Sequence, residues 1–194
     1  NGKFVTTKTE AYELKTAVWR PTDGTATWGS LAWLLNGTGS PVAFEDGWSA
    51  LFDGQETASP TSVKVEGPVK ASIVTVNATR DYLFDGDGSL SAAKLVKKGT
   101  GTLTLESSVL GATRDIEIQQ GQIKVGDHAK RGALGADGGT VTIKPGASLD
   151  VNYIDTASGA MRDRAYISNG KKFVIEGSGV NGEGALTISN GNTY

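Results

Sequence analysis

Four tryptophans lie in the first quarter of the chain, and their side chains are well suited to binding a ligand by surface contact. They are Trp19, Trp28, Trp33 and Trp48, in a sequence of 194 residues. An exposed indole ring offers a large and rigid contact at a low cost in conformational entropy, and its face can stack on the C–H face of a sugar ring. The alternative is that these rings are buried and close one end of the fold. The sequence leaves both interpretations open for each of the four.

A second group of candidate binding residues lies in an irregular stretch, residues 152–170, that interrupts an otherwise regular pattern of strands. Long loops that leave a regular scaffold often carry function. Tyrosine rings can stack on a sugar, and arginine and carboxylate groups can hydrogen-bond to its hydroxyls. The alternative is a solvated loop that binds nothing. The candidates in this stretch are Tyr153, Tyr166 and Arg164, with Asp155 and Arg162 beside them.

Residues that could catalyse a reaction are sparse. The 21 acidic residues are spread over predicted turns, and no compact pair has the spacing expected of a general acid and base. The only histidine, His128, lies in a polar connection and is predicted to be an exposed loop residue. The absence of cysteine excludes thiolate catalysis, disulfides and cysteine-based zinc sites, and a single histidine excludes a multi-histidine metal site. We therefore predict a binding protein without a cofactor rather than an enzyme.

The segment Asp85-Gly-Asp-Gly-Ser89 resembles the start of a calcium-binding loop. Its fifth position is serine, where aspartate or asparagine is required, and no glutamate stands at the twelfth. A tight turn between strands explains the segment better than a calcium site.

Composition narrows the range of partners. The net charge is −2, the pI is about 5.5, and the 19 basic residues are scattered, which disfavours nucleic acid. No apolar run approaches the ~20 residues that span a bilayer, so no membrane partner is expected. Glycine is abundant, at 27 residues against 5 prolines, as suits many tight turns between short strands.

The elements that would position these residues are set out by a repeated phrase of glycine followed by alternating polar and apolar residues. Its clearest copies begin at residues 101, 121 and 139, in steps of 20 and then 18. A period near this value is typical of parallel β-solenoids. The copies are Gly101-Thr-Leu-Thr-Leu105, Gly121-Gln-Ile-Lys-Val125 and Gly139-Thr-Val-Thr-Ile143, with looser relatives at 146–151 and 184–188.

Each copy has two apolar side chains on one face, which a lone strand cannot bury. Stacking equivalent strands about 4.8 Å apart would pair their backbones and align the apolar residues in ladders. The glycines would occupy the corners. The predicted interior residues are Leu103, Leu105, Ile116, Ile118, Ile123, Val125, Val141, Ile143, Leu149 and Val151.

These observations predict an all-β fold, a single-stranded parallel β-helix of about seven to nine rungs. An antiparallel β-sandwich is the main competitor, but the phrase itself repeats here and not only the alternation. We expect one module, with residues 1–60 as an aromatic-rich N-terminal cap and lead-in. Residues 61–194 would form regular rungs, interrupted at 152–170. Within the cap, residues 30–35 are expected to form a short helical turn, with Ser30 at its start and Gly37 after its end.

The motifs resemble the autotransporter-associated β-strand repeat over about residues 28–151. The resemblance implies a right-handed parallel β-helix of a secreted or surface bacterial protein. The segments that carry it are Trp28-x-x-x-x-Trp33, Trp48-Ser-Ala-Leu-Phe-Asp-Gly54, Tyr82-x-Phe-x-Gly-x-Gly-x-Leu90, Leu95-Val-Lys-Lys-Gly-Thr-Gly-Thr-Leu-Thr-Leu105, Ile118-Gln-Gln-Gly-Gln-Ile-Lys-Val-Gly126, Ala133-Leu-Gly135 and Val141-x-Ile-x-x-Gly-Ala-x-Leu149.

The compact chain also resembles a family of carbohydrate-binding modules that have a parallel β-helix fold, accompany xylanases of gut bacteria and bind xylan. The resemblance implies a non-catalytic module, monomeric within a larger multidomain enzyme, that holds a secreted bacterial glycoside hydrolase on plant cell-wall polysaccharide. It assigns no binding residue one by one. The alternatives are a fragment of an autotransporter passenger or adhesin with a structural surface role, and a small β-helix lyase or hydrolase.

Overall fold

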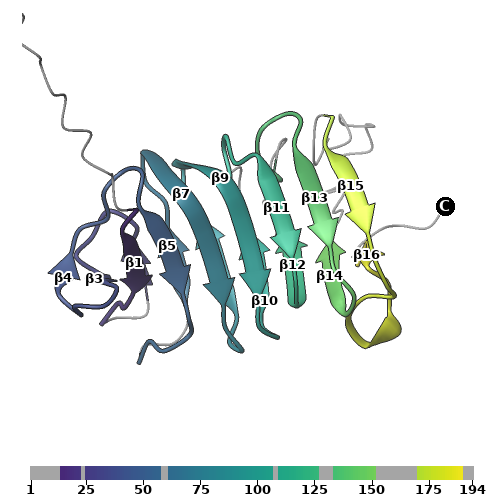
Figure 1. Cartoon of the computed structure of the whole chain (residues 1–194), viewed down its shortest axis with the longest axis horizontal. Helices are drawn as coiled ribbons and strands as arrows, with labels where there is room; N and C mark the ends of the chain where they lie inside the picture. Colours follow the sequence, from purple (N-terminus) through teal and green to yellow (C-terminus); the bar gives the residue numbers. More distant parts are fainter. Residues whose placement is uncertain are drawn as a thin grey trace, which may run out of the picture.

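The fold is built from two largely parallel β-sheets in a β-solenoid-like arrangement (Figure 1). A computed structural model describes residues 14–22, 25–57, 61–106, 109–126, 133–151 and 170–189. From β5 onward, successive strands along the chain alternate between the two sheets, and each strand pairs in parallel with the strand two places further on. The predicted all-β class and parallel pairing are confirmed at this level.

The first sheet contains nine strands in the order β15-β13-β11-β9-β7-β5-β1-β3-β4. Their bounds are β1 Thr16–Trp19, β3 Trp33–Leu35, β4 Pro41–Val42, β5 Ser49–Phe52, β7 Pro68–Asn77, β9 Ser89–Lys98, β11 Asp115–Ile118, β13 Thr140–Ile143 and β15 Lys172–Ile175.

The second sheet contains seven strands in the order β16-β14-β12-β10-β8-β6-β2. Their bounds are β2 Thr25–Thr27, β6 Ser62–Lys64, β8 Tyr82–Asp85, β10 Thr102–Leu105, β12 Gly121–Val125, β14 Ala147–Asp150 and β16 Leu186–Thr187. A short 3₁₀ helix, η1, spans Val180–Gly182 between β15 and β16.

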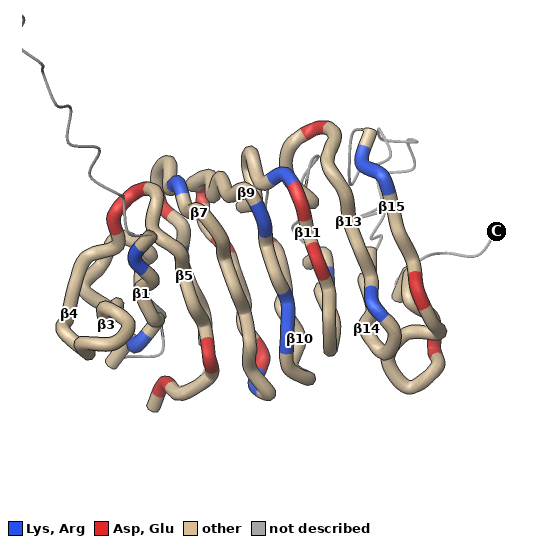
Figure 2. The backbone as a smooth tube through the Cα atoms, in the orientation of Figure 1, with Lys and Arg blue, Asp and Glu red and all other residues tan. Residues whose placement is uncertain are grey.

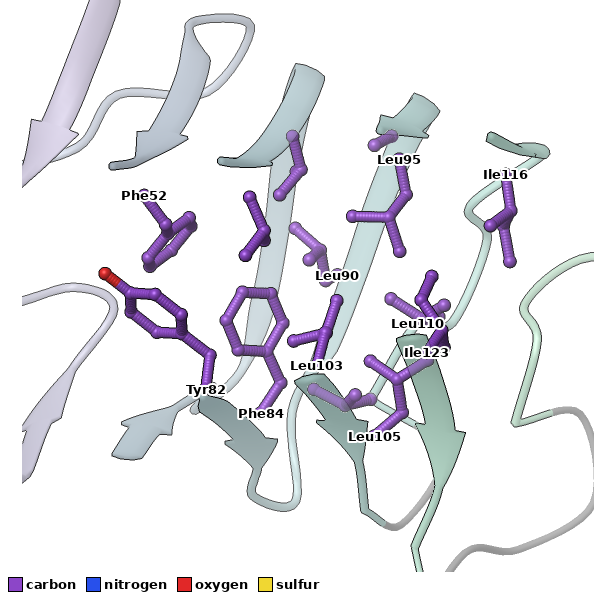
Figure 3. Close-up of a cluster of buried hydrophobic side chains, with 14 of the residues drawn as sticks. Phe52, Tyr82, Phe84, Leu90, Leu95, Leu103, Leu105, Leu110, Ile116 and Ile123 are labelled. Carbon is purple, nitrogen blue, oxygen red and sulfur yellow. The ribbon is translucent and has the colours of Figure 1, made fainter. Parts of the chain in front are cut away.

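Ladders of apolar side chains fill the space between the sheets, because the parallel register repeats the same face in every coil (Figure 3). One ladder in the second sheet runs through Tyr82, Leu103, Ile123, Leu149 and Leu186. Of the ten predicted interior residues, nine are buried and Val151 is partly buried against the core. The predicted core is therefore confirmed almost residue by residue.

The repeat period is corrected by the strand pairing. The phrase at residues 139–143 forms β13, which belongs to the first sheet, whereas the phrases at 101 and 121 form β10 and β12 in the second. The step of 18 residues is thus a crossing between sheets. True coil lengths follow from paired positions: Leu103 to Ile123 is 20 residues, Ile123 to Leu149 is 26 and Leu149 to Leu186 is 37. Coils lengthen toward the C-terminus through longer connections.

The N-terminal end is closed by an antiparallel hairpin and aromatic rings. β3 pairs antiparallel with β1, and β4 pairs antiparallel with β3. The expected helical turn at residues 30–35 is wrong, because Trp33–Leu35 is strand β3 and Trp33 lies opposite Trp19. Cross-strand pairing and burial of the Trp33 ring outweigh the local capping signal of Ser30, whose hydroxyl instead donates to the carbonyl of Thr27.

Candidate functional site

Three of the four tryptophans have no surface on which a ligand could stack. Trp19, Trp28 and Trp33 are at most 1% exposed. Their rings pack on one another, with centroids 4.8 Å apart for Trp19 and Trp33 and 5.0 Å apart for Trp28 and Trp33. A ring enclosed on both faces cannot receive a sugar, so direct stacking is corrected for these three residues. They close the end of the core, which is the alternative that the sequence left open.

Trp48 keeps part of its surface accessible. It lies just before β5 at the N-terminal end of the first sheet and is half-buried. The ammonium of Lys15 sits 5.1 Å from the centroid of its ring, and Phe44 contacts it at 6.3 Å. A cation over an indole face is a favourable contact, so the lysine occupies one face of the ring. Trp48 remains a predicted sugar-stacking residue with one face taken.

The other predicted binding residues, Tyr153, Tyr166 and Arg164, lie outside the described residues, as do Asp155, Arg162 and His128. Their assignment to binding or to a solvated loop stays a prediction.

A polar hollow of about 390 Å³ lies on the outer face of the second sheet, over its C-terminal coils. Hydroxyl, amide and carboxylate side chains dominate its lining. The lining residues are Thr100, Thr102, Gly121, Gln122, Ser148, Asp150, Val180, Glu183, Thr187 and Ser189. This is the candidate site that we call the polar hollow.

Strand register brings the lining together. Thr102 in β10 lies opposite Gln122 in β12, and Gln122 lies opposite Ser148 in β14. The next outward row continues from Asp150 in β14 to Thr187 in β16. Outward positions in one strand alternate with the buried apolar positions, so the same repeat that builds the core also aligns these polar groups across coils.

One wall of the polar hollow is a tight loop that Ser148 holds in place. The Ser148 hydroxyl donates to the carbonyl of Gly184 at 2.8 Å and accepts the N–H of Val180 at 2.8 Å. Both bonds cross from β14 to the loop around η1. Asp150 is 4% exposed, and its carboxylate accepts the backbone N–H of Ser189 at 3.1 Å. Because Ser148 and Asp150 are tied to the backbone, they shape the hollow more than they contact a ligand.

The remaining lining groups can bind a neutral ligand rich in hydroxyls. Threonine hydroxyls and the Gln122 amide both donate and accept hydrogen bonds, as sugar hydroxyls do. The two carboxylates, Asp150 and Glu183, disfavour an anionic ligand. Basic and acidic residues are interspersed along the coils, with no extended surface of one sign among the described residues (Figure 2). In the same ranges, no cluster of three or more histidine, aspartate or glutamate side chains is placed to hold a metal ion.

The residues of the polar hollow were not singled out by sequence reasoning. Thr102, Gln122 and Ser148 were assigned only to rung surfaces. A signal was present, because Gly101-Thr-Leu, Gly121-Gln-Ile and Ala147-Ser-Leu each place a polar residue before an interior residue. Aligning the phrases by these interior residues, Leu103, Ile123 and Leu149, puts the polar residues in one row.

A second polar cluster links the first coils at their corner, near the aromatic end. Arg20 and Asp53 form a bidentate pair with both N–O distances at 2.6 Å. Burial pushes the pKa of Asp53 upward, but the hydrogen bonds from Arg20 and from the Gln55 N–H outweigh it and hold that pKa below its usual value. The pair stabilises the join between β1 and the end of β5.

The same corner contains a buried carboxylate. Glu56 is 6% exposed, accepts the hydroxyl of Tyr82 and faces Arg80 at 3.4 Å. Burial, together with the hydrogen bond to Glu56, raises the pKa of Tyr82 well above its usual range. Tyr82 therefore stays protonated and donates permanently to Glu56. These partners bind coil to coil and leave no free acid and base.

Tyr82→Phe is expected to lower the free energy of unfolding by about 2 kcal/mol. The ring would still fill its place in the core, but buried Glu56 would lose a donor and the N–H of Gly54 would lose its acceptor at 3.2 Å. Urea denaturation of the two proteins measures the difference. Thr104→Val, which changes a half-exposed hydroxyl in the neighbouring strand β10, is the control and should change stability by less than about 0.5 kcal/mol. Equal effects of the two substitutions would contradict the role of the Tyr82 hydroxyl.

Comparison with known proteins identifies no relative, since no family model, curated protein or solved structure matches this chain. Among the described residues, no helix has the length and apolar character needed to cross a bilayer. The class of protein that the fold and the polar hollow define is therefore a β-solenoid-like domain with a hydroxyl- and amide-lined surface.

Proposed function

We propose that this protein is a non-catalytic carbohydrate-binding module with the fold of a right-handed parallel β-helix. In this proposal it holds a secreted bacterial glycoside hydrolase, such as a xylanase, on plant cell-wall polysaccharide. The ligand is xylan, and it binds in the polar hollow of the second sheet. The resemblance of the repeat to β-helix modules motivates the ligand class.

The observation that carries the proposal is the row of neutral polar side chains across successive strands of the second sheet. Thr102, Gln122 and Thr187 come from β10, β12 and β16, and all line the polar hollow. Adjacent strands in a sheet lie about 4.8 Å apart, which is of the same order as the length of one sugar residue in an extended chain. A polysaccharide lying across the strands would therefore present successive residues to successive coils.

The hydrogen-bonding character of the site has a consequence for affinity. A hydrogen bond exchanged with water contributes only about 1 kcal/mol, so several coils must act together to hold a chain. The lining without an aromatic platform thus favours a ligand long enough to span the coils. We expect xylan polymer to bind more tightly than short xylo-oligosaccharides.

Affinity electrophoresis on xylan, glucans and pectins tests the proposal. Retardation by xylan is expected, and Gln122→Ala should weaken it about fivefold, because the amide can exchange two or more hydrogen bonds with sugar hydroxyls. Thr75→Ala, on the outer face of β7 in the first sheet, is the matched control and should migrate as the unchanged protein does. Absence of retardation in every gel would overturn the proposal.

A further variant separates the two possible binding surfaces. Trp48→Ala removes the tryptophan that keeps some accessible surface, at the opposite end of the molecule from the polar hollow (Figure 1). If the polar hollow binds, Trp48→Ala retains retardation by xylan. Loss of retardation in Trp48→Ala, with none in Gln122→Ala, would move the site to the N-terminal end.

A further inference from the structure

The C-terminal coil exposes side chains at positions that are interior in every preceding coil. In the first sheet, Phe173 and Ile175 are 38% and 48% exposed, whereas their register partners in β13, Val141 and Ile143, are fully buried. In the second sheet, Leu186 is 45% exposed over a fully buried Leu149. The interior ladders thus end on an apolar surface, to which the exposed Ile188 belongs as well.

The same end presents an open strand edge. Among the described residues, β15 is the last strand of the first sheet. Lys172 and Glu176 direct their N–H groups at β13, to the carbonyls of Gly139 at 3.0 Å and Ile143 at 2.9 Å. Backbone groups in a strand point alternately to the two sides. The N–H and C=O groups of Phe173 and Ile175 therefore face the open edge, where a further strand can pair with them.

The opposite end of the molecule cannot supply that strand. There the first sheet terminates in β4, which contains Pro41, and the core is closed by Trp28, Trp33 and Phe44. A proline without an N–H and a short antiparallel hairpin protect a sheet edge against pairing. A second copy therefore meets the open end only with its own open end.

The charges of β15 are self-complementary in that arrangement. A two-fold axis through Val174 pairs β15 antiparallel with itself and places Lys172 opposite Glu176 of the other copy, twice. It also places Phe173 opposite Ile175, and these are the two residues whose backbone groups face the edge. Residues of this kind form the hydrogen-bonded pairs of an antiparallel ladder, so backbone parity and charge agree on one register.

We propose that two copies of this chain associate tail to tail through β15, with Val174 on the two-fold axis. The interface pairs the edge strands, covers the exposed ends of the ladders and adds two pairs between Lys172 and Glu176, whose carboxylate already accepts from Lys144 at 2.8 Å. This replaces the expectation of a monomer. It goes beyond the proposed function and does not depend on it, although two polar hollows in one dimer would raise avidity for a polymer.

A single cysteine tests the register, because the chain contains none. In the proposed dimer the two Val174 residues form a non-hydrogen-bonded pair with Cα atoms about 4.5 Å apart, which is within reach of a disulfide. Val174→Cys should form a disulfide-linked dimer under mild oxidation. Thr142→Cys is the control, since Thr142 lies opposite Val174 one coil further in. It should stay monomeric on a non-reducing gel, and equal cross-linking of both variants would overturn the register.

The charge pairs provide an independent test that needs no cross-link. Sedimentation of the unchanged protein over a concentration series should show a monomer–dimer equilibrium. Lys172→Glu sets glutamate against Glu176 twice and should weaken the dimer at least tenfold. Lys98→Glu, at the end of interior strand β9, should leave it unchanged. A monomer at every concentration would overturn the proposal, whatever the xylan gels show.

Discussion

Gly121→Ala is expected to lower the free energy of unfolding by about 4 kcal/mol, the largest effect of any single substitution proposed for this protein. Gly121 has a φ of +69°, which strains any residue with a side chain. An added Cβ would lie 2.5 Å from the carbonyl oxygen of Gly99 and 2.6 Å from that of Gly101. Both oxygens belong to the backbone of the corner one coil earlier, so relief requires the coils to separate.

The control for this substitution is Gly146→Ala. Gly146 has a φ of +79°, but an added Cβ would meet nothing within 4 Å. Its alanine variant therefore carries the backbone strain without the collision and should cost about 1–2 kcal/mol. Urea denaturation of both variants measures the difference. If Gly121→Ala costs no more than Gly146→Ala, the close approach of stacked corners does not limit this fold.

The interior of the fold could be predicted because alternation within a strand determines which residues face inward. Ile116, Ile118 and Leu149 were predicted from this alternation and are buried. Alternation says nothing about which sheet a strand joins. The phrases that form β12 and β13 look the same in sequence, although they lie in different sheets. Coil length was misjudged for this reason.

The candidate site was harder to predict than the core because it depends on contacts between distant segments. Tryptophan is as suited to a closed core as to a binding surface, and its sequence position does not tell them apart. Trp33 is buried because β3 folds back on β1, which no local pattern indicated. The row of Thr102, Gln122 and Ser148 forms only once β10, β12 and β14 are in register.

Lys97 departs from the alternation in a way that the sequence did not reveal. In sequence it is one of a pair of scattered basic residues, yet it lies at an interior ladder position, opposite Val76 and Ile118, and is fully buried. Its ammonium donates to the carbonyls of Lys98 at 2.9 Å, Gly99 at 2.7 Å and Gln120 at 3.3 Å. Corners of two stacked coils are thus joined by one cation.

Lys171 joins other coil corners in the same way. It is 8% exposed, and its ammonium donates to the carbonyls of Arg114 at 2.6 Å and Gly138 at 3.1 Å. Burial lowers its pKa. Tight corners leave backbone carbonyls without strand partners, and a buried polar group without a partner costs about 1–3 kcal/mol. A long side chain with three donors satisfies several such carbonyls at once, which explains why an apolar ladder tolerates a lysine.

Lys97→Met should destabilise the protein by about 2 kcal/mol near pH 7, because methionine fills the ladder position but leaves the corner carbonyls without their donor. The matched substitution Lys98→Met changes the neighbouring, partly exposed lysine and should cost less than about 0.5 kcal/mol. Urea denaturation at one pH distinguishes the two variants, and equal stability of both would contradict the role of Lys97.

The pH dependence of the same pair gives a sharper result. Burial lowers the pKa of Lys97 to about 8, whereas an unfolded chain restores it to its usual value near 10.5. Between these two values the unfolded state binds more protons, so the contribution of Lys97 to stability increases as pH rises from 8 to 10.5. The stability gap between the unchanged protein and Lys97→Met should therefore widen by about 2 kcal/mol over this range, allowing for solvent screening. The gap to Lys98→Met serves as the reference, and a gap to Lys97→Met that stays constant or narrows would show that the Lys97 ammonium keeps its proton within the carbonyl cage.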